Sequence, residues 1–237
     1  AEAAVVVYGN GRVASGVAAM LAASGVGWVC TAADGTVQPE DTGCGYVASD
    51  VGEPRPLSAA RAVRRVAGET RVERLPPRRL PDVAVLADAV VPDPRLSAGL
   101  AAAGVPHLLA HAGDGVAVVG PLIRPGRTCC LRCVEMHHTD SDPCWPALAT
   151  QLAAGRQQAD LASAQVAAAF AVAQVLQLLH GPVSDGLDSQ GASIEIDVFT
   201  GQISRTVWEP HPRCGCRAAA AGSGGARETG SDAREEQ

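Results

Sequence analysis

The sequence predicts an α/β fold with a doubly wound, mainly parallel sheet that ends in a C-terminal antiparallel hairpin. Two observations predict it. An apolar β-branched run near the start leads through a glycine turn into a helical pattern, and further short apolar runs alternate with alanine-rich helical patterns. Close to the end, residues 193–208 alternate apolar and polar side chains around Thr200-Gly201, as a hairpin does.

The first unit of this fold lies within the first 32 residues. Residues 4–8 form the opening strand, and apolar side chains from Val13 to Leu21 recur at helical spacing. Gly25-Val26-Gly27 ends that helix, and residues 28–32 supply a second strand. Together these segments form a βαβ unit of the Rossmann-like kind.

The rest of the chain continues the alternation of strands and helices. We expect strands at 83–86, 107–110 and 116–119, helices at 58–67 and 96–103, and a long helix over 160–180. One domain is expected over residues 1–217. The tail, 218–237, is rich in Ala, Gly and charged residues and is expected to be disordered.

Composition narrows the classes of partner. The net charge of -6 argues against a dominant interaction with nucleic acid or an anionic membrane surface. No stretch approaches about 20 uninterrupted apolar residues, and the start does not resemble a signal peptide, so we expect a cytoplasmic protein. Lysine is absent, which excludes any mechanism that needs a lysine of this chain.

Four cysteines in two close pairs predict a structural zinc site. Cys130 and Cys133 lie one helical turn apart, and Cys214 and Cys216 form a tighter pair. Four soft sulfur ligands without a carboxylate describe a closed site that selects zinc. The alternative is disulfides or separate buried thiols, because the two pairs lie about 80 residues apart. The neighbours Cys129, His137 and His138 are not expected to be ligands.

The glycine turn favours nucleotide binding. Gly9-x-Gly11-x-x-Ala14 follows a strand and precedes a helix, and Asp34 lies where an acid could bind a ribose. This pattern is typical of NAD(P)-binding proteins. A dehydrogenase would also need a substrate domain and catalytic groups, and the sequence offers neither.

Further motifs point to a known family. They are Gly25-Val26-Gly27, Thr36-Val37 with Asp41, Asp50-Val51-Gly52, Gly120-Pro121, and Pro125-Gly126 before Cys130-x-x-Cys133. With these motifs, residues 4–216 resemble the ThiF/MoeB/HesA family of ubiquitin-activating-like proteins. Trp145-Pro146, Gln151 and His211-Pro212 make the chain most similar to the ThiF-like components of thiazole/oxazole-modified microcin (TOMM) cyclodehydratases.

The resemblance implies that the glycine loop and its surroundings hold ATP and Mg²⁺. Family members that are enzymes adenylate the C-terminal carboxylate of a peptide or small protein. Gly9 and Gly11 match this loop, and Ser15 matches its closing small hydroxyl residue. Arg12 and Ala14 replace glycines whose missing side chains let phosphate approach. The predicted phosphate cradle is therefore partly obstructed.

Other positions depart from the family pattern as well. The ribose-binding acid falls at Ala33, next to Asp34, and the arginine beside the phosphates falls near Cys44. Arg55 stands in place of the family's lysine, and Asp88 matches the carboxylate near magnesium. Adenylation depends on such charged groups. The absence of the acid at Ala33 and of the arginine near Cys44 therefore favours a protein that does not adenylate.

Cys144 falls near the loop where sulfur-carrying relatives place a reactive cysteine. The neighbouring acids Asp140 and Asp142 would disfavour its thiolate. We therefore do not expect Cys144 to act as a nucleophile.

The sequence favours a zinc-containing, non-adenylating scaffold that binds a precursor peptide or a partner modifying enzyme in a TOMM-like system. One alternative is an active adenylyltransferase with Asp88 and Arg55 as catalytic residues. Another is an NAD(P)-binding oxidoreductase that uses Gly9, Gly11 and Asp34. The resemblance also implies a homodimer, and an upstream winged-helix module that holds the leader peptide in such relatives.

Overall fold

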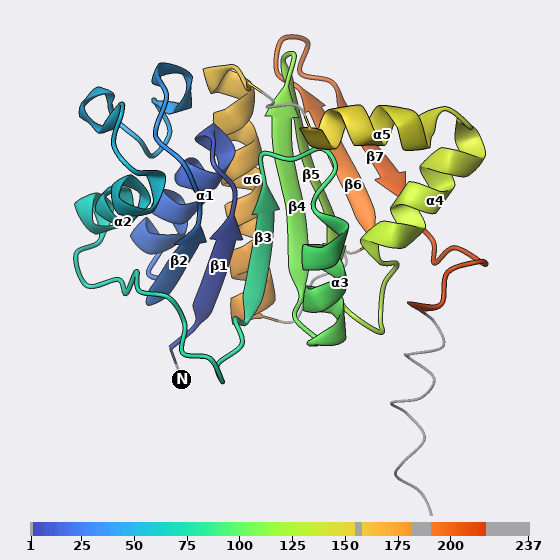
Figure 1. The fold of residues 1–237 in the computed structure, drawn as a ribbon, viewed down its shortest axis with the longest axis horizontal. Helices are drawn as coiled ribbons and strands as arrows, with labels where there is room; N and C mark the ends of the chain where they lie inside the picture. The colour runs from blue at the N-terminus through green and yellow to red at the C-terminus, as the bar shows by residue number, and fades with distance from the viewer. Residues whose placement is uncertain (1, 155–157, 182–190, 217–237) are drawn as a thin grey trace, which may run out of the picture.

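A mixed sheet forms the centre of the protein in the computed structural model, which describes residues 2–154, 158–181 and 191–216 (Figure 1). Its seven strands have the order β2-β1-β3-β4-β5-β6-β7. The strands are β1 Ala4–Tyr8, β2 Trp28–Ala32, β3 Val83–Ala87, β4 His107–Gly113, β5 Val116–Ile123, β6 Ala192–Asp197 and β7 Ile203–Val207. The helices are α1 Arg12–Ala23, α2 Arg55–Val66, α3 Pro94–Ala102, α4 Leu131–Ser141, α5 Trp145–Ala154 and α6 Leu161–His180.

The sheet divides into a parallel and an antiparallel half. Strands β2, β1, β3 and β4 are parallel, whereas β4, β5, β6 and β7 pair antiparallel. The α/β fold and the C-terminal hairpin, β6–β7, are thus confirmed. The antiparallel half begins at β5, because Asp114-Gly115 joins β4 to β5 with positive φ angles of 51° and 81°. This two-residue turn is too short for the crossover that a parallel pair requires.

Helices cover both faces of the sheet (Figure 1). Alternate strand residues such as Val5 and Val85 pack against α1 and α6 in one core cluster. Residues of the opposite face, such as Leu86 and Leu109, pack against α3 and α4 in a second cluster. The glycine turn and the cysteine pairs lie at the ends of these layers, where loops leave the sheet.

Helix α6 is the longest helix of the described residues. It is the one helix of the described residues that is long and apolar enough, by length and composition, to cross a membrane. Ala164, Ala167, Ala171 and Val175 are fully buried in the core that α6 forms with α1 and the sheet. Helix α6 is apolar because it packs in the core against α1 and the sheet.

Asp160 caps the start of α6, and its removal is expected to destabilise the fold. Its carboxylate accepts hydrogen bonds from the backbone amides of Ser163 at 2.9 Å and Gly115 at 3.2 Å. Loss of an N-cap typically costs about 0.5–2 kcal/mol. Urea denaturation of Asp160→Ala should report a loss in this range, whereas the exposed Glu69→Ala should change stability by less than about 0.5 kcal/mol. Equal stabilities of the two variants would contradict this role.

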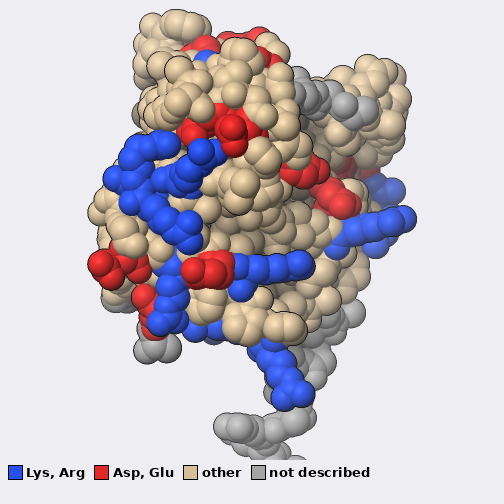
Figure 2. Space-filling view, turned by 60° about the vertical axis from the view of Figure 1, so that its left-hand side comes forward, with Lys and Arg blue, Asp and Glu red and all other residues tan. Residues whose placement is uncertain are grey.

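Arginines gather on the face around α2, interleaved with acidic side chains (Figure 2). Arg61 and Arg65 approach Asp50 at 3.9 Å and 3.3 Å, and Arg61 also approaches Glu53 at 3.4 Å. The arginine side chains are 48% and 42% exposed. The exposed pair of Arg61 with Glu53 contributes little stability. Asp50 is buried, with a side chain 3% exposed, and the two arginines neutralise its charge. The predicted disordered tail, 218–237, lies outside the described residues.

Candidate metal centre and glycine-loop site

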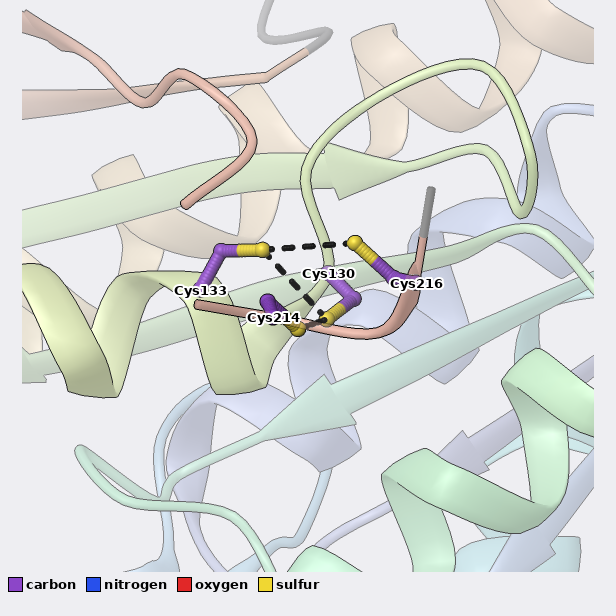
Figure 3. A group of neighbouring side chains, drawn as sticks. All are labelled: Cys130, Cys133, Cys214 and Cys216. Carbon is purple, nitrogen blue, oxygen red and sulfur yellow. Dashed lines mark hydrogen bonds between the residues drawn. The ribbon is translucent and has the colours of Figure 1, made fainter. Parts of the chain in front are cut away.

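Four cysteine sulfurs converge beside the start of α4 (Figure 3). Cys130 precedes the first residue of α4 and Cys133 lies in its first turn, while Cys214 and Cys216 follow β7. The Sγ atoms are 3.7 Å apart for Cys130 and Cys133, 3.6 Å for Cys130 and Cys214, and 3.4 Å for Cys133 and Cys216. All four ligand atoms lie within 4.8 Å of one another.

These distances fit a shared metal ion better than disulfide bonds. Four sulfurs at 2.3 Å from a tetrahedral zinc ion would lie about 3.8 Å apart. Bonded sulfurs in a disulfide would lie only about 2.05 Å apart. The four cysteines could therefore hold a metal ion, and none of the ligands would be a carboxylate or a histidine.

The sulfurs differ in how readily they ionise. Burial raises the pKa of Cys130 to about 11 and also raises the pKa of Cys216. The pKa of Cys133 is lowered: burial opposes this, but backbone and sulfur hydrogen bonds outweigh it. A metal ion binds cysteine as the thiolate, so each thiol would have to lose its proton when the ion binds.

Asp140 ties the second cysteine pair to α4. Its Oδ2 lies 2.9 Å from Nε2 of the buried His211, and its other oxygen accepts from Arg213. The backbone amide of Cys214 in turn donates to the His211 carbonyl at 2.9 Å. These contacts place the segment before Cys214 against the helix that carries Cys133. No sequence pattern predicted these contacts, because more than 70 residues separate Asp140 from its partners.

The neighbours of the four sulfurs lie apart from the cluster. Cys129 is buried in the core, where burial raises its pKa to about 12. His137 donates from Nε2 to the Glu209 carbonyl, 2.8 Å away, and His138 stacks on Trp145 with ring centroids 4.3 Å apart. Cys144 is exposed just before α5. Helices α4 and α5, which carry His137, His138 and Trp145, were not among the elements expected from the sequence.

At the glycine loop, the Asp88 carboxylate is hydrogen-bonded to the backbone amides at the start of α1. It accepts hydrogen bonds from the backbone N–H groups of Gly11 at 2.7 Å, Val13 at 3.0 Å and Ala14 at 3.4 Å. Burial raises the pKa of Asp88, although these amides act in the opposite direction. A helix N-terminus is where a phosphate would bind. Here an anion of the chain itself takes that place.

The loop glycines make room for this carboxylate. A Cβ at Gly9 would lie 2.7 Å from Asp88 Oδ2, and one at Gly11 would lie 2.9 Å from Oδ1. Gly9 also has a positive φ of 154°. The glycine pattern that predicts phosphate binding is thus also required by Asp88.

Arg12 and Ser15 are held by backbone groups. Arg12 donates from Nε to the Thr42 carbonyl at 2.8 Å and from a terminal nitrogen to the Ala159 carbonyl at 2.6 Å. Ser15 is buried, and its hydroxyl donates to the Arg12 carbonyl at 3.2 Å. Neither side chain is directed at a phosphate position by these contacts.

Arg55 forms a buried ion pair with Asp41. The two groups meet at 2.7 Å, and their side chains are 5% and 7% exposed. A second guanidinium nitrogen of Arg55 donates to the backbone carbonyl of Asp34 at 2.9 Å. Asp34 itself is exposed, and its carboxylate accepts from the side-chain amide of Asn10 at 2.5 Å. Sequence reasoning missed Asp41 and Asn10 as partners, because neither spacing follows a known motif.

The cavity at the glycine loop is small. Gly9, Gly11, Arg12, Asp41 and Asp88 contribute to its lining, and its volume is about 240 Å³. Ligand pockets usually have volumes of about 300–1,000 Å³. The structure brings the predicted loop residues together, but Arg55 and Asp34 do not line this cavity.

Solved structures share this fold. The chain matches E. coli MccB with bound AMPCPP and MccA at a TM-score of 0.73 and 22% identity, over 91% of this chain and 66% of MccB. It matches another crystal structure of E. coli MccB at a TM-score of 0.71 and 20% identity, over 99% of this chain and 68% of MccB. PaaA matches at 0.68 and 17%, over 87% and 73%.

These matches confirm the fold that the sequence resemblance implies. One of the similar structures is described as the microcin C7 biosynthetic enzyme MccB in complex with N-formylated MccA. The chain spans about two thirds of the length of the MccB structures. No family model and no curated protein matches the sequence.

Proposed function

We propose that this chain is a zinc-stapled, ThiF-like scaffold that binds a precursor peptide or a partner modifying enzyme and does not itself adenylate. It would serve a peptide-modifying system of the TOMM cyclodehydratase kind in the cytoplasm. The sequence resemblance and the fold shared with MccB support the class of system. The contacts around the glycine loop support the absence of adenylation.

The observation that carries the proposal is that the charged groups of the loop already have partners within the chain. Asp88 occupies the amides at the start of α1, Arg55 is paired with Asp41, and Arg12 donates to two backbone carbonyls. Phosphoryl chemistry needs cations and acids that are free to hold phosphate and Mg²⁺. Binding ATP here would require several of these contacts to break together.

The metal site is assigned to zinc on its donor set. Cys130, Cys133, Cys214 and Cys216 supply only sulfur, and soft thiolates favour Zn²⁺ over Mg²⁺ or Ca²⁺. With four protein ligands the ion would have no open position, so its role would be structural. It would hold the segment after β7 against α4.

A peptide is the proposed substrate class because MccB structures contain the MccA peptide. The proposed domain covers residues 1–217 and acts as a homodimer, as the sequence resemblance implies. The proposed partner enzyme would supply the ATP chemistry. Light scattering at several concentrations tests the dimer, which a strictly monomeric mass would contradict.

ATP binding and ATP–pyrophosphate exchange test the proposal. Calorimetry with ATP or AMPCPP and Mg²⁺ should detect no binding with a Kd below about 1 mM. This Kd corresponds to a binding free energy of about −4.1 kcal/mol. E. coli MccB, whose structure with ATP is known, serves as the positive control. Exchange with candidate precursor peptides should stay at background. Magnesium-dependent exchange that Asp88→Ala abolishes would instead establish the active adenylyltransferase, with Asp88 and Arg55 at the nucleotide.

The same calorimetry tests the oxidoreductase alternative. Gly9, Gly11 and Asp34 would then bind NAD(P), and Asp34 is exposed beside the loop. Tight NAD(P) binding without ATP binding would favour this role over the scaffold. Under the proposal neither nucleotide binds.

A further inference from the structure

A second, larger cavity lies between α3, α4 and α5, beside the cysteine cluster. Its volume is about 680 Å³, within the range of small-molecule sites. Apolar side chains dominate its walls, among them Val91, Pro94, Ala98, Leu131, Ala149 and Ala153. Residues 145–153 of α5 include no buried side chain, so this helix covers the cavity without filling it. Cys130, Cys214 and Cys216, three of the proposed metal ligands, also line this cavity, and the rest of its space has no role assigned above.

His107 places one polar atom in this apolar lining. It is the first residue of β4, is 1% exposed and lines the cavity. Its Nδ1 lies 2.9 Å from the Val105 carbonyl, which can only accept, so Nδ1 carries the hydrogen. Burial lowers the pKa of His107, which keeps the ring neutral and leaves Nε2 as an acceptor.

Nε2 of His107 has no hydrogen-bond partner among the described residues. This nitrogen is open to the cavity, because no fully enclosed side-chain nitrogen or oxygen of the described residues lacks a hydrogen-bond partner. A ligand in the cavity that presents an N–H or O–H group would satisfy this acceptor. The remaining apolar lining favours a ring or hydrocarbon for the rest of the ligand.

Arg132 adds a positive charge to the lining. It is exposed, and within the described ranges it forms no ion pair or side-chain hydrogen bond. Glu135 also lines the cavity, and its carboxylate accepts from the indole N–H of Trp145 at 2.7 Å. The guanidinium is thus available for a carboxylate, to which it can donate two parallel hydrogen bonds.

We propose that this cavity binds an aromatic carboxylic acid whose ring carries an N–H or O–H donor. The ring fills the apolar space, its donor bonds to Nε2 of His107, and its carboxylate pairs with Arg132. Indole and phenol acids have this chemistry, either as free small molecules or as a Trp or Tyr at the C-terminus of a peptide. The proposal does not depend on ATP binding.

Binding to the zinc-loaded full chain tests this proposal. The probes are 3-(indol-3-yl)propionate, its N1-methyl analogue, N-acetyl-Gly-Trp and the C-terminal amide of that dipeptide. The unmodified acid or the dipeptide should bind in calorimetry, and methylation or amidation should weaken binding on the order of tenfold. Stronger binding of the free acid points to a small molecule, and stronger binding of the dipeptide points to a peptide terminus.

Variants localise the binding to this cavity. Ala149→Trp introduces a large side chain from α5 into the lining and should abolish binding. Ala147→Trp is the matched control, because Ala147 is exposed on the same helix and outside the lining. Arg132→Gln should remove the preference for acid over amide. The proposal is overturned if neither unmodified probe binds, if methylation has no effect, or if Ala149→Trp binds as the unmodified protein does.

Discussion

Removing the metal from the four-cysteine site is expected to lower the melting temperature by about 8–16 °C. A ligand present at 1,000 times its Kd stabilises the folded state by about 4.1 kcal/mol. For a domain of 150–250 residues, each kcal/mol changes Tm by about 2–4 °C. Thermal denaturation with and without a zinc chelator measures this difference. The variant Cys133→Ser should show the same loss without chelator, because it removes one of the four sulfur ligands.

Matched controls separate the metal from other effects of cysteine. Cys144→Ser should keep both the metal and the Tm, because Cys144 is exposed and lies outside the cluster. A reductant without chelator should leave the Tm unchanged, whereas disulfides would make the protein sensitive to it. Metal analysis should find one zinc per chain. Far less than one, or a Tm insensitive to chelator, would refute the zinc assignment.

The second large effect is expected from Asp41→Ala. This change leaves the Arg55 guanidinium buried without its carboxylate, and breaking a buried pair in this way costs about 3–5 kcal/mol. It also removes the acceptor for the backbone amide of Gln38, 2.8 Å away. Urea denaturation should therefore show a loss of several kcal/mol. The expected effect is on the free energy of unfolding, because Arg55 binds Asp41 and the Asp34 carbonyl and is not proposed to bind a nucleotide.

A double variant distinguishes the pair from the individual side chains. Asp41→Leu with Arg55→Met removes both charges and should be more stable than Asp41→Ala alone, since no buried charge remains unpaired. Arg61→Met is the surface control: its side chain is 48% exposed, and its loss should cost less than about 1 kcal/mol. A cost for Asp41→Ala as small as that of Arg61→Met would contradict the structural role of Asp41.

Local patterns predicted most of the secondary structure. The βαβ unit, the helix over 160–180 and the hairpin around Thr200-Gly201 each have periodicity and terminal residues that depend only on near neighbours. The antiparallel start at β5 was missed although Asp114-Gly115 is a strong hairpin signal. Helix α5 lacked a clear pattern because it covers a cavity and buries no side chain among residues 145–153.

The candidate sites were likewise predicted where residue type and spacing are informative, and missed where distant segments pack together. The cysteine spacing predicted which four sulfurs meet, because zinc ligands have a chemistry that the residue types reveal. By contrast, the contacts of Asp88, Arg55 and Asp34 depend on how distant segments pack. Residues 11 and 88 are 77 positions apart, and no spacing indicates that the carboxylate of one would bond to the amide of the other.

The separation of the cysteine pairs also affects the newborn chain. Cys133 leaves the ribosome 83 residues before Cys216. At about 5–20 residues per second, the first pair waits roughly 4–17 s before its counterpart exists. During that interval Cys129, Cys130 and Cys133 are adjacent thiols without a complete ligand set. Under the proposed metal assignment, these thiols would be open to oxidation throughout that interval.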